Sequence, residues 1–202
     1  MRLIDRALLR ASRRPEDRGE AAHRRDMLAS ATGVVVELGA GAGATFAHYP
    51  AAVSRVIAVE PAEPLRERAA EVAAGAKVPI EVVPGRAEAI PVADHTADTV
   101  VASLVLCSVD DLDAVVREIS RVLVPHGRVL FYEHVRAAGA RGGLERAATP
   151  LWSRIAGGCH LDRDPVAAFE RAGYRVTHRR MRFAPVRGLP GVDHVIAAAT
   201  RG

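Results

Sequence analysis

The fold of this chain is decided by the stretch Val34-Val-Val-Glu37-Leu-Gly39-Ala-Gly41-Ala-Gly43-Ala-Thr45. An apolar, β-branched run leads directly into closely spaced glycines, and a helix is predicted to begin near Ala44. Glycines let the backbone pass close beneath a ligand, and a helix N-terminus presents free N–H groups there. Gly39, Gly41 and Ala44 also fit the G-x-G-x-x-G/A pattern of dinucleotide-binding turns, so the turn alone leaves the ligand open.

Apolar runs typical of buried strands alternate with stretches of helical spacing over most of the chain. The predicted strands are Val34–Leu38, Val56–Val59, Ile80–Val83, Thr99–Leu106, Arg128–His134, Tyr174–Met181 and Val192–Ala199. The predicted helices are Glu63–Ala74, Asp111–Leu123 and Pro165–Ala172. Near-continuous apolar strands separated by helices predict a doubly wound α/β domain, with a mostly parallel sheet covered on both faces.

Two segments differ from this pattern, and they set the predicted domain organisation. Residues 1–30 are rich in arginine, with apolar residues on one helical face: Leu3, Ile4, Ala7, Leu8 and Ala11. This short basic amphipathic helix could pack on the edge of the main domain, residues 31–202, close over its ligand as a lid, or rest weakly on a membrane surface. Residues 137–164 hold five glycines and are predicted to be a substrate-side insertion.

The composition of the 202 residues, 49% hydrophobic and 26% charged, is that of a globular domain. No apolar run approaches the roughly 18 residues that cross a bilayer, so we expect a soluble, cytoplasmic protein. The net charge is +4, but Lys77 is the single lysine among 28 basic residues and only 4% of residues are aromatic. Few rings are therefore available to stack on bases, and we expect no nucleic-acid partner.

Several enzyme classes lack their motifs here. The residues around Lys77 do not form a P-loop, and neither a G-x-S-x-G elbow nor an H-E-x-x-H zinc motif occurs. Cys107 and Cys159 have no C-x-x-C spacing and give no disulfide framework. We interpret both as small buried residues and predict no metal site.

Two acidic residues narrow the choice of ligand for the glycine-rich turn. Glu60 ends the second predicted strand, where a carboxylate can accept both hydroxyl protons of a ribose; a solvated charge is the alternative. Glu37 lies inside the first strand, where a carboxylate is costly unless it meets a cation or N–H donors. The ammonium and sulfonium groups of S-adenosylmethionine would meet that need, whereas a pyrophosphate would be repelled.

Five motifs in order resemble those of the class I S-adenosylmethionine-dependent methyltransferases with a type 11 domain. They are Glu37–Gly43, Ala58–Pro61, Gly85–Pro91, Asp98–Leu106 and Leu123–Leu130. A closer likeness, to the animal alkyl-thiol methyltransferases, lies in Ser103–Val109, Glu133–Val135, Trp152 and Gly158–Arg163. Those proteins are membrane-anchored, and we expect no such anchor here.

The resemblance implies a Rossmann-like, seven-stranded sheet and a set of cofactor-binding residues. Gly39, Gly41 and Gly43 would line the methionine portion of S-adenosylmethionine, with Glu37 beneath them. Glu60 and Pro61 would hold the ribose, the loop of Arg86, Ala87 and Glu88 would flank the adenine, and Ser103 and Leu104 would lie beside the adenosyl group. The family usually has an acid where Arg86 stands, so the adenine N6 contact must come from the backbone or from Glu88. His126 replaces the first glycine of the usual Pro-Gly-Gly turn.

The acceptor side is predicted from fewer residues. Methyl transfer is an in-line displacement that depends on positioning and desolvation, and a base can take the acceptor's proton. His134 and His160 are the candidate catalytic residues, although His134 could merely bond a neighbouring loop and the family has asparagine at position 160. An apolar wall is predicted from Leu151, Trp152, Ile155 and Leu161. Such a pocket favours a small thiol.

The sequence therefore predicts an S-adenosylmethionine-dependent methyltransferase that acts on a small molecule, with a thiol as the favoured acceptor. An O- or N-methyltransferase of a small metabolite is the alternative. A nicotinamide-dependent reductase is more remote, because Tyr132–Arg136 lacks the lysine of a Tyr-x-x-x-Lys motif. An RNA methyltransferase would need an Asn/Asp-Pro-Pro-aromatic motif after the fourth strand. A silent nucleoside-binding protein and the oligomeric state stay open.

Overall fold

The computed structural model describes residues 9, 18–137, 139–155, 158–183 and 192–201, without some side chains of the helix that ends at residue 155. The strands are β1 (Gly33–Leu38), β2 (Val53–Val59), β3 (Ile80–Val83), β4 (Ala97–Ser103), β5 (Leu123–His134), β6 (Arg175–Phe183) and β7 (Val192–Thr200). The helices are α2 (Arg18–Leu28), α3 (Glu63–Ala73), α4 (Leu112–Val122), α5 (Ala140–Ile155) and α6 (Pro165–Arg171), with a short 3₁₀ turn η1 (Phe46–His48).

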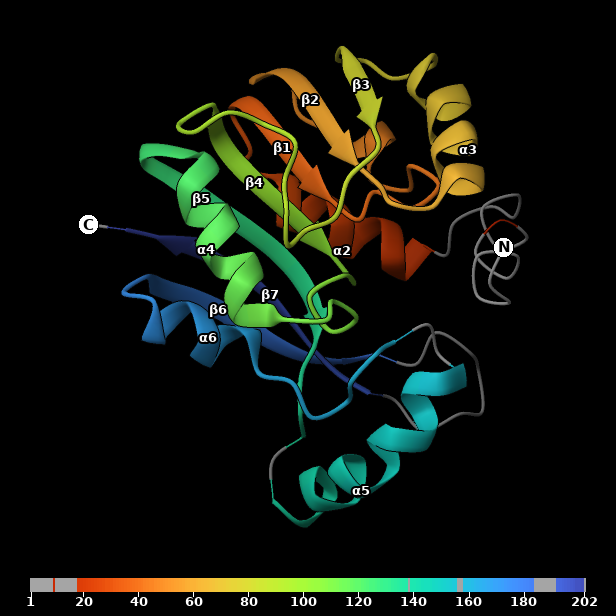
Figure 1. Cartoon of the computed structure of the whole chain (residues 1–202), viewed down its shortest axis with the longest axis vertical. Helices are drawn as coiled ribbons and strands as arrows, with labels where there is room; N and C mark the ends of the chain where they lie inside the picture. Colours follow the sequence, from red (N-terminus) through yellow and green to blue (C-terminus); the bar gives the residue numbers. More distant parts are fainter. Residues whose placement is uncertain (1–8, 10–17, 138, 156–157, 184–191, 202) are drawn as a thin grey trace.

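The strands form one seven-stranded sheet in the order β3-β2-β1-β4-β5-β7-β6 (Figure 1). Neighbouring strands from β3 to β5 are parallel, and β7 runs antiparallel to both β5 and β6. The predicted doubly wound, mostly parallel sheet is confirmed. The strand order reverses between β1 and β4, and the crevice at the carboxyl ends of strands at such a point is where open α/β sheets bind ligands.

Helices cover both faces of the sheet because each carries an apolar stripe. On one face, α4 and α6 pack with the side chains of Val115, Ile119 and Phe169, all fully buried. On the other face, α2 and α3 contribute Leu28 and Ala69 to a second buried cluster. These two layers fix the strands and leave their carboxyl ends to the loops.

Two local predictions near the carboxyl ends are wrong. The fourth strand ends at Ser103 and not at Leu106, because Leu104 adopts a left-handed conformation with φ +57° that breaks the strand. The helix expected near Ala44 is only the three-residue turn η1. The next residue, Tyr49, precedes Pro50 and is extended, and the residue before a proline is disfavoured in a helix, so the turn does not lengthen.

The predicted insertion, residues 137–164, contains the 16-residue helix α5, which lies apart from the sheet (Figure 1). Leu151 is 68% exposed, so it is not part of the predicted apolar wall. The side chains of Trp152 and Ile155 lie outside the described part of the structure. The wall prediction is therefore wrong for Leu151, whereas Leu161, the other member whose side chain is described, is half-buried.

The described part of the N-terminal segment packs on the sheet. Met27 and Leu28 of α2 are buried, as is Ala31, which follows the helix. Helix α2 thus packs on one face of the sheet, and the three alternatives for the amphipathic helix stay predictions, because the apolar residues that define its face lie outside the described residues. Within the described part of the chain, none of the helices combines the length and the apolar character needed to span a bilayer.

Candidate active site

The glycine-rich turn after β1 adopts a backbone that glycine alone accommodates readily. Gly39, Gly41 and Gly43 have φ values of 59°, 57° and 83°. A Cβ at Gly39 would lie 2.4 Å from the Val105 side chain, and one at Gly43 would lie 2.7 Å from the ring of Phe46. At Gly41 the nearest atom would be the Gly39 carbonyl oxygen, 4.0 Å away. Gly39 and Gly43 thus permit close packing, whereas Gly41 faces open space that a ligand can approach.

The carboxylate of Glu60 ties this turn to the end of β2. Its Oε2 accepts a hydrogen bond from the Gly41 N–H at 3.0 Å, and its Oε1 accepts one from the Ala62 N–H at 2.8 Å. The side chain is buried, so the alternative of a solvated charge is wrong. These two backbone contacts hold the carboxylate between the glycine turn and the start of α3.

Glu37 is buried beneath the glycine turn. Thr45 Oγ1 donates to Glu37 Oε1 at 2.5 Å, and the Tyr49 hydroxyl donates to Oε2 at 2.7 Å. Burial raises the pKa of Glu37 to about 7, although the two hydroxyl donors and the charge of Arg24 lower it. Within the chain this carboxylate therefore meets two hydroxyl donors and the charge of Arg24, and its contact with the cationic groups of S-adenosylmethionine stays a prediction.

The loop of residues 86–88 is fastened to the segment that follows β4. The Arg86 guanidinium donates to Asp110 at 2.5 Å, and its Nε lies 3.4 Å from Glu88 Oε2. Glu88 Oε1 in turn accepts the Asp110 N–H at 2.8 Å. Ala87 between them is buried. The charged groups of this loop therefore hold the loop in place, beside the end of β3.

The end of β4 is strained. Ser103 pairs with Tyr132 of β5, and the N–H of the next residue, Leu104, donates to the Tyr132 carbonyl at 2.8 Å. A left-handed backbone at a non-glycine residue such as Leu104 costs on the order of 1–3 kcal/mol and persists where its surroundings enforce it. Such strain is concentrated at functional sites, and the predicted contact of Ser103 and Leu104 with the adenosyl group stays a prediction.

Glu133 enforces this turn, and it was not among the predicted site residues. Its buried carboxylate accepts the N–H groups of Val105 at 2.7 Å, Leu106 at 2.8 Å and Cys107 at 3.4 Å. Burial raises the pKa of Glu133 to about 7 against the lowering effect of these donors. The sequence pattern that could have identified Glu133 is the same as for Glu37: an acidic residue inside an apolar strand.

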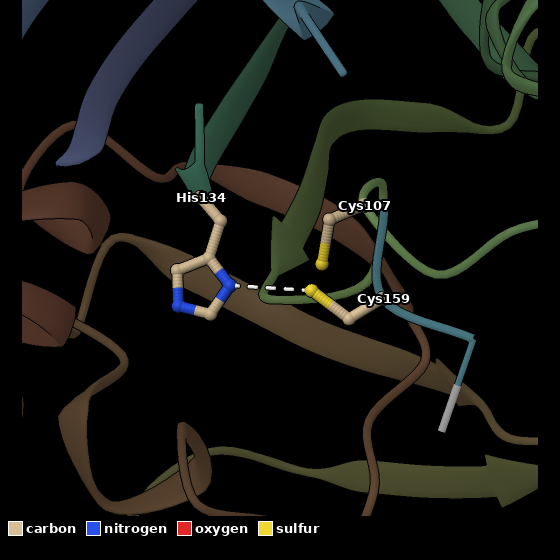
Figure 2. Close-up of side chains that lie close together, drawn as sticks. All are labelled: Cys107, His134 and Cys159. Carbon is tan, nitrogen blue, oxygen red and sulfur yellow. Dashed lines mark hydrogen bonds between the residues drawn. The ribbon is translucent and has the colours of Figure 1, made fainter. Parts of the chain in front are cut away.

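Cys107, His134 and Cys159 come together and form what we call the thiol–histidine cluster (Figure 2). His134 Nδ1 lies 3.5 Å from Cys159 Sγ, and the three side-chain ligand atoms all lie within 4.8 Å of one another. The predicted burial of both cysteines is confirmed. The hydrogen bond with Cys159, burial and the charge of Glu133 raise the pKa of the Cys107 thiol well above its usual value.

The two candidate bases lie at this cluster. His134 is the last residue of β5, and its ring meets the ring of His194 edge-on at 4.3 Å between centroids. Burial lowers the pKa of His134, but the hydrogen bond and charge of Cys159, with the charge of Glu133, raise it above its usual value. The His160 N–H donates to the Cys107 carbonyl at 2.8 Å, and His160 Nδ1 lies 3.3 Å from the same oxygen.

Comparisons with known proteins place the chain in a family. Residues 36–131 match the methyltransferase domain family. The chain is 32% identical over 173 residues to the thiol S-methyltransferase TMT1B of Rattus norvegicus, an alignment that covers 83% of this chain and 70% of that protein.

Solved structures agree on the fold. The YcgJ protein from Bacillus subtilis superposes with a TM-score of 0.75 at 17% identity, covering 92% of this chain and 99% of that one. Geranyl diphosphate methyltransferase in complex with S-adenosylmethionine gives a TM-score of 0.71 at 16% identity, covering 91% and 85%. The chain belongs to the S-adenosylmethionine-dependent methyltransferases, in the same family as the thiol S-methyltransferases.

Proposed function

We propose that this enzyme transfers the methyl group of S-adenosylmethionine to the sulfur atom of a small alkyl thiol. The observation that carries the proposal is the 32% identity to a thiol S-methyltransferase over 83% of the chain. The geometry of the carboxyl edge of the sheet supports it, because the residues predicted to bind the methyl donor and the thiol–histidine cluster both lie at that edge.

The donor side is proposed to lie over the ends of β1 to β4. Gly41 faces open space and would admit the methionine portion, while Gly39 and Gly43 shape the turn. Glu60 and Pro61 end β2 at the place of the ribose, and Ser103 and Leu104 would contact the adenosyl group. The Glu88 carboxylate already holds Asp110, so of the two partners expected for the adenine N6 group we favour the backbone of residues 86–88.

The acceptor side is proposed to lie over the ends of β4 and β5, at the thiol–histidine cluster with its two buried cysteines. In the reaction the acceptor sulfur attacks the methyl carbon in line as the bond from that carbon to the sulfonium sulfur breaks. The products are a methyl thioether and S-adenosylhomocysteine, and the acceptor's proton is released. A poorly hydrated thiolate loses less than an alkoxide when water is excluded, which suits a buried site.

A matched series of acceptors tests this proposal. Butanethiol, butanol and butylamine share one carbon skeleton, so that only the attacking atom differs when each is incubated with methyl-labelled donor. We expect labelled methyl thioether from the thiol, at a rate that climbs with pH, because the thiolate becomes more abundant as the pH approaches the thiol's own pKa. Methylation of the amine or alcohol with no thioether at any pH would replace the thiol assignment by N- or O-methylation.

A further inference from the structure

The thiol–histidine cluster unites side chains from three separate segments. Cys107 lies in the loop after β4, His134 ends β5, and Cys159 lies in the segment after α5. Figure 2 shows the three side chains directed toward a common point. Their ligand atoms lie within 4.8 Å of one another, although the residues are far apart in the sequence.

The spacing of these atoms is close to that of a tetrahedral zinc site. Zn–S bonds of about 2.3 Å and Zn–N bonds of about 2.0–2.1 Å place neighbouring ligand atoms about 3.6–3.8 Å apart. The 3.5 Å between His134 Nδ1 and Cys159 Sγ already fits. The upper limit of 4.8 Å for the other pairs means that they need to close by about 1 Å or less.

Hydrogen bonds of the chain itself hold the segments that carry the cysteines. The Cys107 N–H donates to Glu133 at 3.4 Å, and the Cys107 carbonyl accepts the His160 N–H at 2.8 Å. The Arg163 guanidinium donates to the Leu106 carbonyl at 2.9 Å, which ties the two segments together once more. The three ligand positions are therefore built into the fold before any ion arrives, as an effective metal site requires.

We propose that Cys107, His134 and Cys159 bind one thiophilic divalent cation, Zn²⁺ in the first instance, and leave its fourth position open to the acceptor thiol. Two thiolates and an imidazole select Zn²⁺ over Mg²⁺ or Ca²⁺, which prefer oxygen ligands. Three protein ligands with an open position are the pattern of reactive zinc sites, whereas purely structural sites are closed by four.

Binding displaces the protons of the two cysteine thiols, and no electrons are transferred. An acceptor thiol that enters the fourth position loses its own proton to solvent and is held as a thiolate beside the donor. Metal binding stands on the geometry alone, whereas this second role rests on the proposed thiol methylation.

The metal site is tested with Co²⁺, which reports tetrahedral thiolate coordination by its visible bands and a near-ultraviolet charge-transfer band. The protein is first treated with a chelator and a reductant, and a thiol assay confirms that both cysteines are reduced. It is then titrated with Co²⁺ and afterwards with Zn²⁺. We expect saturation at one Co²⁺ per chain and displacement by Zn²⁺. Reduced protein that gives no such bands overturns the proposal.

Variants assign the ligands. Cys159→Ser and His134→Gln should each weaken Co²⁺ binding by at least about 100-fold, more than the loss of a residue that only supports a ligand. His178→Gln, an exposed histidine on β6, is the matched control and should bind as wild type. Metal-free melting of each variant separates lost ligation from lost folding, and Cys107→Ser provides a second thiol variant. Unchanged affinity in folded Cys159→Ser and His134→Gln would overturn the assignment.

The acceptor role has its own readout. Adding butanethiol to the Co²⁺ protein should strengthen the charge-transfer band, because a third thiolate joins the ion, whereas butanol should leave it unchanged. No change with butanethiol overturns the acceptor role and leaves the metal site. If protein that binds no Co²⁺ forms the thioether at full rate, the metal site is overturned and the proposed function stands. If the protein binds the metal but forms no thioether, the proposed function is overturned and the metal site stands.

Discussion

Two buried carboxylates, Glu37 and Glu60, lie at neighbouring strands below and beside the glycine turn, and their partners give them different tasks. Glu60 accepts the backbone N–H groups of Gly41 and Ala62 and so lies beside the turn, at the place predicted for the ribose. Glu37 accepts hydroxyl groups of Thr45 and Tyr49 and thereby fastens the turn from below. We therefore expect Glu60 to affect ligand affinity and Glu37 to affect stability.

Glu60→Gln should weaken binding of S-adenosylhomocysteine by about 1–3 kcal/mol, the range for losing one partner of a charged hydrogen bond. The amide would place an N–H₂ group where an acceptor is needed. Calorimetric titration measures the effect, with Glu63→Gln in the exposed first turn of α3 as the matched control. Equal affinities of the two variants would show that Glu60 holds the loop but not the ribose.

Glu37 should make the free energy of unfolding fall as the pH rises. Its pKa is about 7 in the folded chain against 4.5 for the free side chain, so between these values the unfolded chain releases the proton first. The total loss is about 3 kcal/mol at about 1.36 kcal/mol per pKa unit. Denaturant unfolding from pH 4.5 to 8 should show a steeper fall in wild type than in Glu37→Gln, because Glu133 contributes a fall of its own in both proteins. A wild-type stability that rises relative to the variant would contradict this expectation.

At the scale of elements, a substitution in the glycine turn can distinguish an effect on stability from an effect on ligand binding. Gly41→Ala places a methyl group in open space at φ +57°, so it should cost about 1–2 kcal/mol in stability from backbone strain alone. Gly139→Ala is the matched control, with φ +66° and no atom within 4 Å of the added Cβ. Both variants should melt alike, and only Gly41→Ala should lose affinity for S-adenosylhomocysteine, by more than about tenfold. Equal affinities would move the methionine portion away from Gly41.

The elements that the sequence predicted are those whose signal is local. The apolar runs of β1 and β3 and the apolar stripe of α4 appear within a residue or two of their predicted bounds. The end of β4 was missed because Val105 and Leu106 continue the apolar run, while the acceptor that turns them, Glu133, comes from another strand. Helix α5 was missed because its glycines and Pro150 disfavour a helix locally.

The candidate site was also predictable only where its residues form a local sequence pattern. The glycine turn and Glu60 form one continuous pattern along β1 and β2, and the structure brings Glu60 to Gly41 as that pattern requires. The thiol–histidine cluster has no such pattern, since its members come from the loop after β4, the end of β5 and the segment after α5, which only the fold brings together. Cys107 and Cys159 therefore gave no spacing signal.

At the scale of the whole molecule, binding of the methyl donor at the carboxyl edge of the sheet should stabilise the folded protein. A ligand that binds only the folded state stabilises it by about 2.7 kcal/mol at a concentration 100 times its Kd. Thermal melts should therefore shift upward with S-adenosylmethionine and with S-adenosylhomocysteine, and not with NAD. Stabilisation by NAD but not by the sulfonium nucleoside would contradict the donor site described above.

The most direct test of thiol methylation is the coupling between donor and acceptor in one reaction. Methyl-labelled S-adenosylmethionine and butanethiol are incubated with the protein, and labelled butyl methyl thioether and S-adenosylhomocysteine are quantified together by mass spectrometry. Because one methyl group passes directly from sulfonium to thiolate, the two products should form in equal amounts from the first time point. S-adenosylhomocysteine that accumulates without the thioether, or a label that reaches an amine or a hydroxyl group and never the thiol, would contradict thiol methylation.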